Sequence, residues 1–239
     1  MVDNFSHPQL FQPTLDIRGL YASFDLPVTD FDCGARCAPQ NPAGVPFCCD
    51  ICHAVPPAYR LEWDYLLNAT DLWHEWRGDE CAAEPVDPAA LREQTPEHML
   101  LLACRGAAHC QRQFRLLSCR QFPFFPYITA DDRFIGLAFF WEFAGKCWVI
   151  DNLQQVTPAF RQAFVRTFDG IFDLWAEEYE AYAVTSQEMR DHFAARRRRI
   201  PILHRNGKNY LLSPVSERLT PLQVFTSPRA RRQPAAGSN

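Results

Sequence analysis

The residues of this chain best suited to chemistry are its cysteines, ten in 239 positions. Five of them lie in residues 31–53, which begin Phe-Asp-Cys-Gly-Ala-Arg-Cys and end Phe-Cys-Cys-Asp-Ile-Cys-His. Three more follow within residues 104–119. Deprotonated thiols hold zinc or iron–sulfur clusters when several converge from neighbouring segments. The spacing therefore predicts a metal site built from both stretches.

The first stretch offers a close-spaced set of thiols. Cys33 and Cys37 are separated by three residues, Cys48 and Cys49 are adjacent, and Cys52 completes a Cys-x-x-Cys with Cys49. Residues that favour turns interrupt the stretch, namely Gly34, Pro42, Gly44 and Pro46. Turns let thiolates point at one centre and free N–H groups to bond the sulfurs. The first four cysteines are predicted ligands, and Cys52 is either a ligand or a buried residue.

The second stretch supplies Cys104, Cys110 and Cys119 as predicted ligands. The apolar run 99–103 brings Cys104 out of the interior, as a helix or a strand. Arg120 directly follows a predicted thiolate, so its guanidinium is expected to bond the cofactor sulfurs and offset their negative charge. The alternative for Arg120 is an ordinary surface arginine.

Four further residues are weighed as ligands. Cys147 lies in a predicted strand, where it is either an inert buried thiol or an additional ligand. Cys81 stands in an acidic turn remote from the other cysteines and is expected to have no role. His53 and His109 each adjoin a cysteine, but a lone histidine more often makes a structural hydrogen bond.

The cysteine pattern resembles the YkgJ-type cysteine-cluster family, described as a zinc- or iron-chelating domain with a Cys-x-x-Cys-x-x-Cys-Cys signature. The resemblance covers roughly residues 31–128 and is sharpest at Cys-Arg-Gln-Phe-Pro-Phe, residues 119–124. It implies that the downstream family cysteines correspond to Cys104, Cys110 and Cys119, and the upstream set to Cys33, Cys37, Cys48 and Cys49. The ten residues between Cys37 and Cys48 depart from the compact signature.

Two classes of function follow. The first is a metalloprotein with a structural, redox or metal-handling role. The second is a cluster-dependent enzyme that modifies a protein or small molecule, since the resemblance extends to clusters associated with some flagellin lysine methylases. No glycine-rich nucleotide loop or nucleophile elbow is present, and no catalytic residue is assigned. A radical S-adenosylmethionine motif is rejected because position 40 is Gln, not Cys.

The kind and number of metal centres stay open. Irregular loops and the scarcity of histidine favour an iron–sulfur cluster, such as a 4Fe–4S cluster, over zinc. The candidate cysteines exceed the four ligands of a mononuclear site. They therefore form two centres, or one binuclear site bridged through Cys48 or Cys49, or they include spectators. The even count also permits disulfides, although a reducing compartment disfavours them.

Charge and hydropathy limit the partners. The net charge of −4 gives no case for nucleic acid, and the basic run Arg196–Arg199 reads as the end of a helix. No signal-peptide pattern and no apolar run of about 20 residues is visible, so a cytoplasmic location without membrane insertion is expected. The expected partners are the metal centre and an unidentified protein or small molecule.

The helices and strands expected to position these thiols together predict an α+β fold. In this fold, irregular cysteine-rich metal-binding loops pack on helices and short β-hairpins. The predicted organisation is an extended arm at 1–30, a cysteine-cluster domain at 31–156, a helical extension with a hairpin on the same core at 157–226, and a disordered tail at 227–239.

Capping and periodicity predict the main elements. A helix is expected from Tyr59, continuing its amphipathic pattern through Trp73 and Trp76. Thr157-Pro158 opens a second helix with an aromatic stripe, and the capping box at 185–188 opens a third. Hairpins are expected over 134–150, turning at Gly145, and at Asn206-Gly207.

Overall fold

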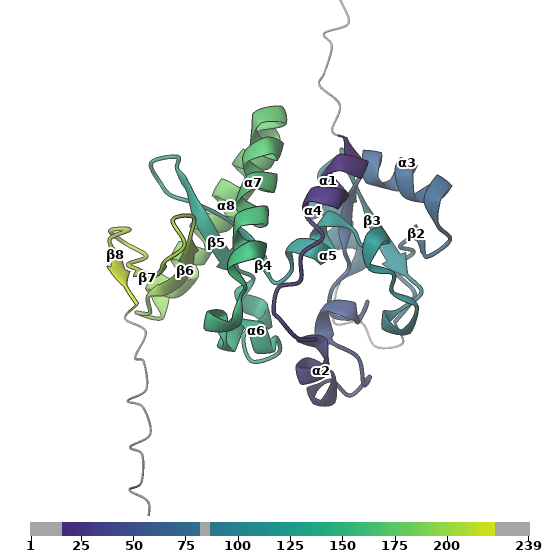
Figure 1. Ribbon diagram of the computed structural model, residues 1–239, viewed down its shortest axis with the longest axis horizontal. Coiled ribbons are helices and arrows are strands. Elements are labelled where there is room, and N and C mark those ends of the chain that lie inside the picture. Colours follow the sequence, from purple (N-terminus) through teal and green to yellow (C-terminus); the bar gives the residue numbers. More distant parts are fainter. Residues whose placement is uncertain (1–15, 82–86, 223–239) are drawn as a thin grey trace, which may run out of the picture.

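The structure is a computed structural model that describes residues 16–81 and 87–222, and its helices and antiparallel sheets confirm the predicted α+β class (Figure 1). The α-helices are α1 (Ile17–Ser23), α2 (Gly34–Cys37), α3 (Arg60–Ala69), α4 (Pro88–Gln94), α5 (Leu117–Gln121), α6 (Trp148–Asp151), α7 (Pro158–Leu174) and α8 (Ala176–Ala195). The strands are β1 (Pro57–Tyr59), β2 (Trp73–Glu75), β3 (Met99–Cys104), β4 (Phe124–Ile128), β5 (Phe134–Phe139), β6 (Ile200–His204), β7 (Asn209–Leu212) and β8 (Leu219–Pro221). Across these two ranges, no helix is long and apolar enough to cross a membrane.

Short 3₁₀ turns connect several of these elements. They are η1 (Ala38–Gln40), η2 (Phe47–Cys49), η3 (Ala107–His109), η4 (Arg112–Phe114), η5 (Trp141–Phe143) and η6 (Leu153–Gln155). Four of the six lie in or between the two cysteine stretches, so these stretches are built from single turns rather than from long regular elements.

The strands form two antiparallel sheets. The smaller sheet has the order β1-β3-β2, and its central strand β3 ends at Cys104, opposite Trp73 of β2. The larger sheet has the order β4-β5-β6-β7-β8, so its strands are neighbours in chain order, with α6 to α8 inserted between β5 and β6. Figure 1 shows the smaller sheet with α1 to α5 in one half of the molecule, and the larger sheet with α6 to α8 in the other.

One cluster of buried apolar side chains runs through both halves. Phe24, just after α1, packs against Phe160 of α7, with ring centroids 5.4 Å apart. Every residue of β4 and β5 is buried. The cysteine-bearing half is therefore joined to the carboxy-terminal half by a continuous apolar core, which stabilises both through burial of nonpolar surface.

Several predicted elements are present. α3 follows Tyr59, and the Tyr59 N–H donates to Glu62 across 3.0 Å at its start. α7 begins after Thr157, whose hydroxyl accepts the Phe160 N–H, and its predicted aromatic stripe packs in or against the core. β6 and β7 form the hairpin predicted at Asn206-Gly207, where φ at Gly207 is 86°.

The predicted extended arm is wrong over Ile17–Ser23, which forms α1. Ile17, Leu20 and Tyr21 are buried, and this spacing of three and four residues is helical. The prolines on either side concealed this short amphipathic segment. Residues 1–15 of the predicted arm and the predicted tail at 227–239 lie outside the described residues.

The hairpin predicted over 134–150 is also wrong. Its first run is β5, which pairs with β4 and β6, while its second run begins α6 after Cys147. A short apolar run such as Cys-Trp-Val-Ile fits a strand and a buried helical turn equally well. The undecided run at 99–103 is a strand, β3.

Two helix predictions need correction. Trp73 lies in strand β2, so the helical pattern extended to Trp76 is wrong. Thr185 lies inside α8 rather than at the start of a new helix, and its hydroxyl donates to the Ala181 carbonyl across 3.1 Å. Threonine hydroxyls make such a bond to the residue four positions earlier in helix interiors, which explains why the capping pattern misled.

Candidate metal centre

The first cysteine stretch folds into single helical turns. α2 begins just after Cys33 and ends at Cys37, so the two thiols are four residues apart on one helical side. Cys48 and Cys49 lie in the 3₁₀ turn η2, with their Sγ atoms 3.9 Å apart in a hydrogen bond. Cys37 is buried, whereas Cys48 is exposed at the surface.

Cys147 joins this stretch from the far end of the chain. The backbone N–H of Trp148, the residue after Cys147, donates to Cys37 Sγ across 3.2 Å. Figure 1 shows α2 and α6 at the same end of the molecule. Burial raises the pKa of Cys147 to about 12, and the nearby charges of Cys37 and Cys33 act in the same direction. The structure thus brings this predicted additional ligand beside Cys33 and Cys37.

The second cysteine stretch is held by donors to two of its sulfurs. Cys104 ends β3, and the Gly106 N–H donates to its Sγ across 3.4 Å. Cys110 follows η3 and accepts a 3.0 Å hydrogen bond from Arg115 Nε. Cys119 lies on α5. Both kinds of donor stabilise a sulfur that carries negative charge.

Arg115 also connects the two stretches electrostatically. Burial lowers the pKa of Arg115, but the hydrogen bond and charge of Cys110, with the charges of Cys49 and Cys119, raise it overall. The hydrogen bond with Cys48 and the charge of Arg115 together lower the pKa of Cys49 to about 7, against the effect of burial. Cys49 of the first stretch is therefore an electrostatic neighbour of Cys110 and Cys119.

The remaining thiols of the second stretch have the same neighbours. Burial raises the pKa of Cys119, and the charges of Cys49, Cys104 and Cys110 raise it further. Burial also raises the pKa of Cys104, together with the charges of Cys49 and Cys110. Each thiol thus disfavours ionisation of the next, a condition that a bound cation would reverse.

The sulfurs are gathered but not convergent. Within residues 16–81 and 87–222, no three histidine, cysteine, aspartate or glutamate side chains are arranged so that they could hold a metal ion. Zinc–thiolate bonds are about 2.3 Å long. Metal binding would therefore require the cysteine turns to draw their sulfurs closer together.

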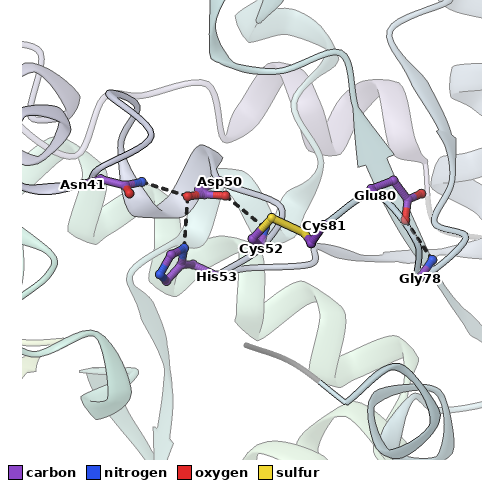
Figure 2. Close-up of a disulfide and its surroundings, with 7 residues drawn as sticks. All are labelled: Asn41, Asp50, Cys52, His53, Gly78, Glu80 and Cys81. Atoms are coloured by element: carbon purple, nitrogen blue, oxygen red, sulfur yellow. Dashed lines mark hydrogen bonds and ion pairs between the residues drawn. A yellow bond between two sulfur atoms is a disulfide. The ribbon is translucent and has the colours of Figure 1, made fainter. Parts of the chain in front are cut away.

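A disulfide joins Cys52 to Cys81, with 5.7 Å between their Cα atoms (Figure 2). The prediction of Cys52 as a metal ligand is wrong for this structure, because its sulfur is already bonded. Cys81 is likewise not the isolated residue that its sequence position indicated. The backbone N–H groups of Arg77 and Gly78 both donate to Glu80, and this turn brings Cys81 back to the first stretch.

Asp50 organises the loop between Cys49 and the disulfide (Figure 2). Its carboxylate accepts hydrogen bonds from Asn41 Nδ2 and the Cys52 N–H, at 2.9 and 3.0 Å, and lies 3.0 Å from His53 Nδ1. Burial raises the pKa of Asp50, but these bonds lower it overall. His53 thus has a structural partner, as expected of a lone histidine, and His109 in η3 stays an untested candidate.

Arg120 does not have the predicted contact with the cysteine sulfurs. Its buried guanidinium donates to six oxygen atoms, which belong to Tyr21, Phe24, Asp25, Arg112, Gln113 and Arg115. Five of these acceptors are backbone carbonyls. Arg120 therefore fixes the loop between Cys110 and Cys119 to the segment after α1, and the arginine that contacts sulfur is Arg115.

Sequence reasoning missed Arg115 because four arginines lie within or next to the second stretch. Arg105, Arg112, Arg115 and Arg120 are all within a few residues of a cysteine. Adjacency favoured Arg120, but in α5 the residue next to Cys119 is turned by about 100° from it, toward the core. The Arg115 side chain reaches back to Cys110 because of the turn η4, and no pattern in the sequence predicted this turn.

Glu62 anchors the helix that carries Cys119. One of its carboxylate oxygens accepts the Tyr21 hydroxyl at 2.7 Å and the Leu117 N–H at 2.8 Å. Its other oxygen accepts the Tyr59 N–H. Since Leu117 is the first residue of α5, Glu62 ties α5 to α1 and α3 and so fixes the position of Cys119.

Comparisons of the chain with protein-family models, with curated proteins and with solved structures found no match. The resemblance to the YkgJ-type family therefore stays a prediction, carried by the motif at 119–124. The function has to be argued from the thiols themselves and the groups that surround them.

Proposed function

We propose that this chain is a metalloprotein that binds an iron–sulfur cluster, or zinc as the competing metal, through thiolates of both cysteine stretches. Its role would be structural, redox or metal-handling. The observation that supports this most is the 3.0 Å hydrogen bond from Arg115 Nε to Cys110 Sγ, together with the charges of Cys49 and Cys119 that act on the same guanidinium. Thiols from distant segments, with a cation beside them, form a setting suited to a negatively charged thiolate–metal centre.

Ionisation of the thiols is the first chemical requirement. Only the thiolate is a metal ligand, so each thiol releases a proton when it binds. The pKa of Cys49 is already lowered to about 7, first by the Cys48 hydrogen bond and then by Arg115. Cys49 is therefore partly ionised near neutral pH, and it is suited to be the first sulfur to capture metal.

Hydrogen bonds to sulfur support the choice of an iron–sulfur cluster. Gly106 and Trp148 offer backbone N–H groups to Cys104 and Cys37, and Arg115 offers a charged donor to Cys110. Donors of this kind stabilise the extra charge of a reduced cluster and set its potential. Zinc, which does not change its oxidation state, gains only ligand orientation from them.

Visible spectroscopy tests this proposal. The full chain, purified without oxygen, should show broad visible absorption that bleaches when dithionite is added. A colourless protein containing stoichiometric zinc would exclude the iron–sulfur cluster and support the zinc version of the proposal. A colourless protein without either metal, after anaerobic reconstitution with iron and sulfide or with zinc, would contradict the proposal as a whole.

A further inference from the structure

We propose that Cys48 and Cys49 form a redox-active pair of adjacent thiols, which reduces small soluble disulfides and is itself oxidised to a Cys48–Cys49 disulfide. The expected substrates are disulfides of the glutathione class. The inference depends on the positions of the two sulfurs and goes beyond the proposed metal-binding function. Because the same two thiols are predicted metal ligands, the oxidised pair would be unable to bind metal as thiolates.

The two sulfurs of the pair lie close together. Cys48 Sγ and Cys49 Sγ are 3.9 Å apart and share a hydrogen bond. A disulfide bond is about 2.05 Å long, so the two sulfurs have to approach each other by about 2 Å. The residues are neighbours in the turn η2, and this approach therefore requires no movement of distant segments.

The turn η2 presents the pair at the protein surface. The Cys48 side chain is exposed and that of Cys49 is half-buried. Phe47, directly before the pair, is buried. The backbone N–H of Cys49 donates to the Pro46 carbonyl across 2.8 Å, which holds the turn closed. A soluble disulfide can thus reach the pair from solvent, while the residues before the pair anchor it.

The loop that carries the pair also carries the Cys52–Cys81 disulfide, and the two disulfides would differ in strain (Figure 2). The Cα atoms of Cys52 and Cys81 are 5.7 Å apart, within the usual range for disulfides. The peptide bond between Cys48 and Cys49 is trans, which places their Cα atoms about 3.8 Å apart, below that range. Strained and exposed disulfides are the easily reduced ones that serve catalysis or regulation.

The reaction consists of two thiol–disulfide exchange steps. One thiolate of the pair attacks a sulfur of the substrate R–S–S–R, which forms a mixed disulfide and releases R–S⁻. The other thiolate then attacks the protein sulfur of the mixed disulfide, which forms the Cys48–Cys49 bond and releases the second R–S⁻. The pair loses two electrons and two protons, and the substrate gains them as two R–SH molecules. Excess glutathione reverses both steps.

Trapping of the oxidised pair tests the inference. The full chain would be treated with chelator, incubated with glutathione disulfide without oxygen, quenched with iodoacetamide and digested for mass spectrometry. We expect an unalkylated peptide containing Cys48 and Cys49 that is lighter by two hydrogen atoms than its reduced form. Cys48→Ser and Cys49→Ser should each retain one glutathione on the remaining cysteine, because the second exchange step cannot occur.

A double variant and a glutathione titration provide the controls. Cys52→Ser combined with Cys81→Ser removes the other disulfide without leaving a free thiol, and this variant should still form the Cys48–Cys49 bond. In glutathione buffers, the Cys48–Cys49 disulfide should be half-reduced at a ratio of squared glutathione to glutathione disulfide at least ~10-fold lower than Cys52–Cys81 requires.

The possible outcomes separate this inference from the proposed function. A wild-type chain that keeps a mixed disulfide, keeps both thiols open to alkylation, or joins either thiol to another cysteine would overturn the inference. Metal content is measured on the chain as purified, before chelation. Bound metal without a Cys48–Cys49 disulfide after oxidation would support the proposed function and refute the inference, and the disulfide without bound metal would do the reverse.

Discussion

The guanidinium of Arg115 donates a hydrogen bond from Nε to the Sγ of Cys110 across 3.0 Å. Arg115 is half-buried, and the charges of Cys49 and Cys119 act on it as well. The charge of Arg115 thus interacts with thiols from both cysteine stretches. A metal centre here would depend on Arg115 both for the orientation of Cys110 and for compensation of negative charge.

Replacing Arg115 should weaken metal binding without removing a ligand. We expect Arg115→Met to lower metal affinity about 10- to 100-fold, the usual loss when a hydrogen-bonding partner of a ligand is removed. Arg115→Lys should recover part of the loss because it restores the charge but not the fixed donor geometry. Competition with a chelator measures the affinity. Arg133→Met, which removes an exposed arginine paired with Asp131, is the control, and an equal loss there would contradict the role of Arg115.

The disulfide predicts that Cys52 and Cys81 behave as a pair. Cys52→Ser and Cys81→Ser should each leave the metal content unchanged, because neither sulfur is free to bind. Each should lower the free energy of unfolding by about 2–4 kcal/mol under non-reducing conditions, since each opens the same loop. Reductant should abolish the difference from wild type. A loss of metal in Cys52→Ser but not in Cys81→Ser would show that Cys52 is a ligand instead.

Glu62 should be required for stability. Glu62→Ala leaves the Tyr21 hydroxyl and the N–H groups of Tyr59 and Leu117 without their acceptor in a buried site. An unsatisfied buried donor costs about 1–3 kcal/mol, so the total loss should be about 3 kcal/mol or more. Tyr21→Phe removes one donor and keeps the acceptor, so it should cost only about 1 kcal/mol. Urea unfolding measures both, and equal losses would contradict this account.

The same carboxyl group should affect the pH dependence of stability. Burial raises the pKa of Glu62 above its ordinary value of 4.5. The folded state therefore holds the Glu62 proton more tightly than the unfolded state does. The stability that this protonated carboxyl contributes is present below pH 4.5 and is lost as the pH rises through the folded pKa. Glu62→Gln does not titrate and should lack this decline. Urea unfolding between pH 4 and 8 in ~1-unit steps compares the two, and identical slopes would contradict the assignment.

Metal removal should loosen the first cysteine stretch before the rest of the chain. Residues 31–53 form only single turns, whereas α7 and the strands β4 and β5 belong to the apolar core. Chelated protein should therefore be cut by protease first within 31–53, while the segment 158–212 stays intact. Mass spectrometry of the fragments locates the cuts. Equal early cleavage within α7 would contradict a core that is independent of metal.

The sequence predicted those elements that strong local signals define. Thr157-Pro158 fixes the start of α7 because a hydroxyl cap and a proline in the first turn leave few alternatives. Asn206-Gly207 fixes its hairpin because glycine tolerates a positive φ. The apolar run after Gly145 had no such signal, and its conformation is decided by packing with distant segments.

The types of residue in the candidate site could be predicted from the sequence, but the contacts between them could not. The eight free cysteines include every predicted thiol except Cys52. Its pairing with Cys81 depends on the fold between them, which spacing does not encode. The same holds for Arg115 and Arg120, whose distances to sulfur are set by the turn η4 and the helix α5 rather than by their order in the chain.

The most direct test of the central claim is elemental analysis of the full chain purified without oxygen. Iron, zinc and acid-labile sulfide would be measured per chain, beside a Cys119→Ser variant prepared identically. We expect iron and sulfide in stoichiometric amounts in the wild type, and clearly less in Cys119→Ser. Wild-type protein that holds neither iron nor zinc, or a Cys119→Ser variant with unchanged metal, would contradict a metal centre built on these thiols.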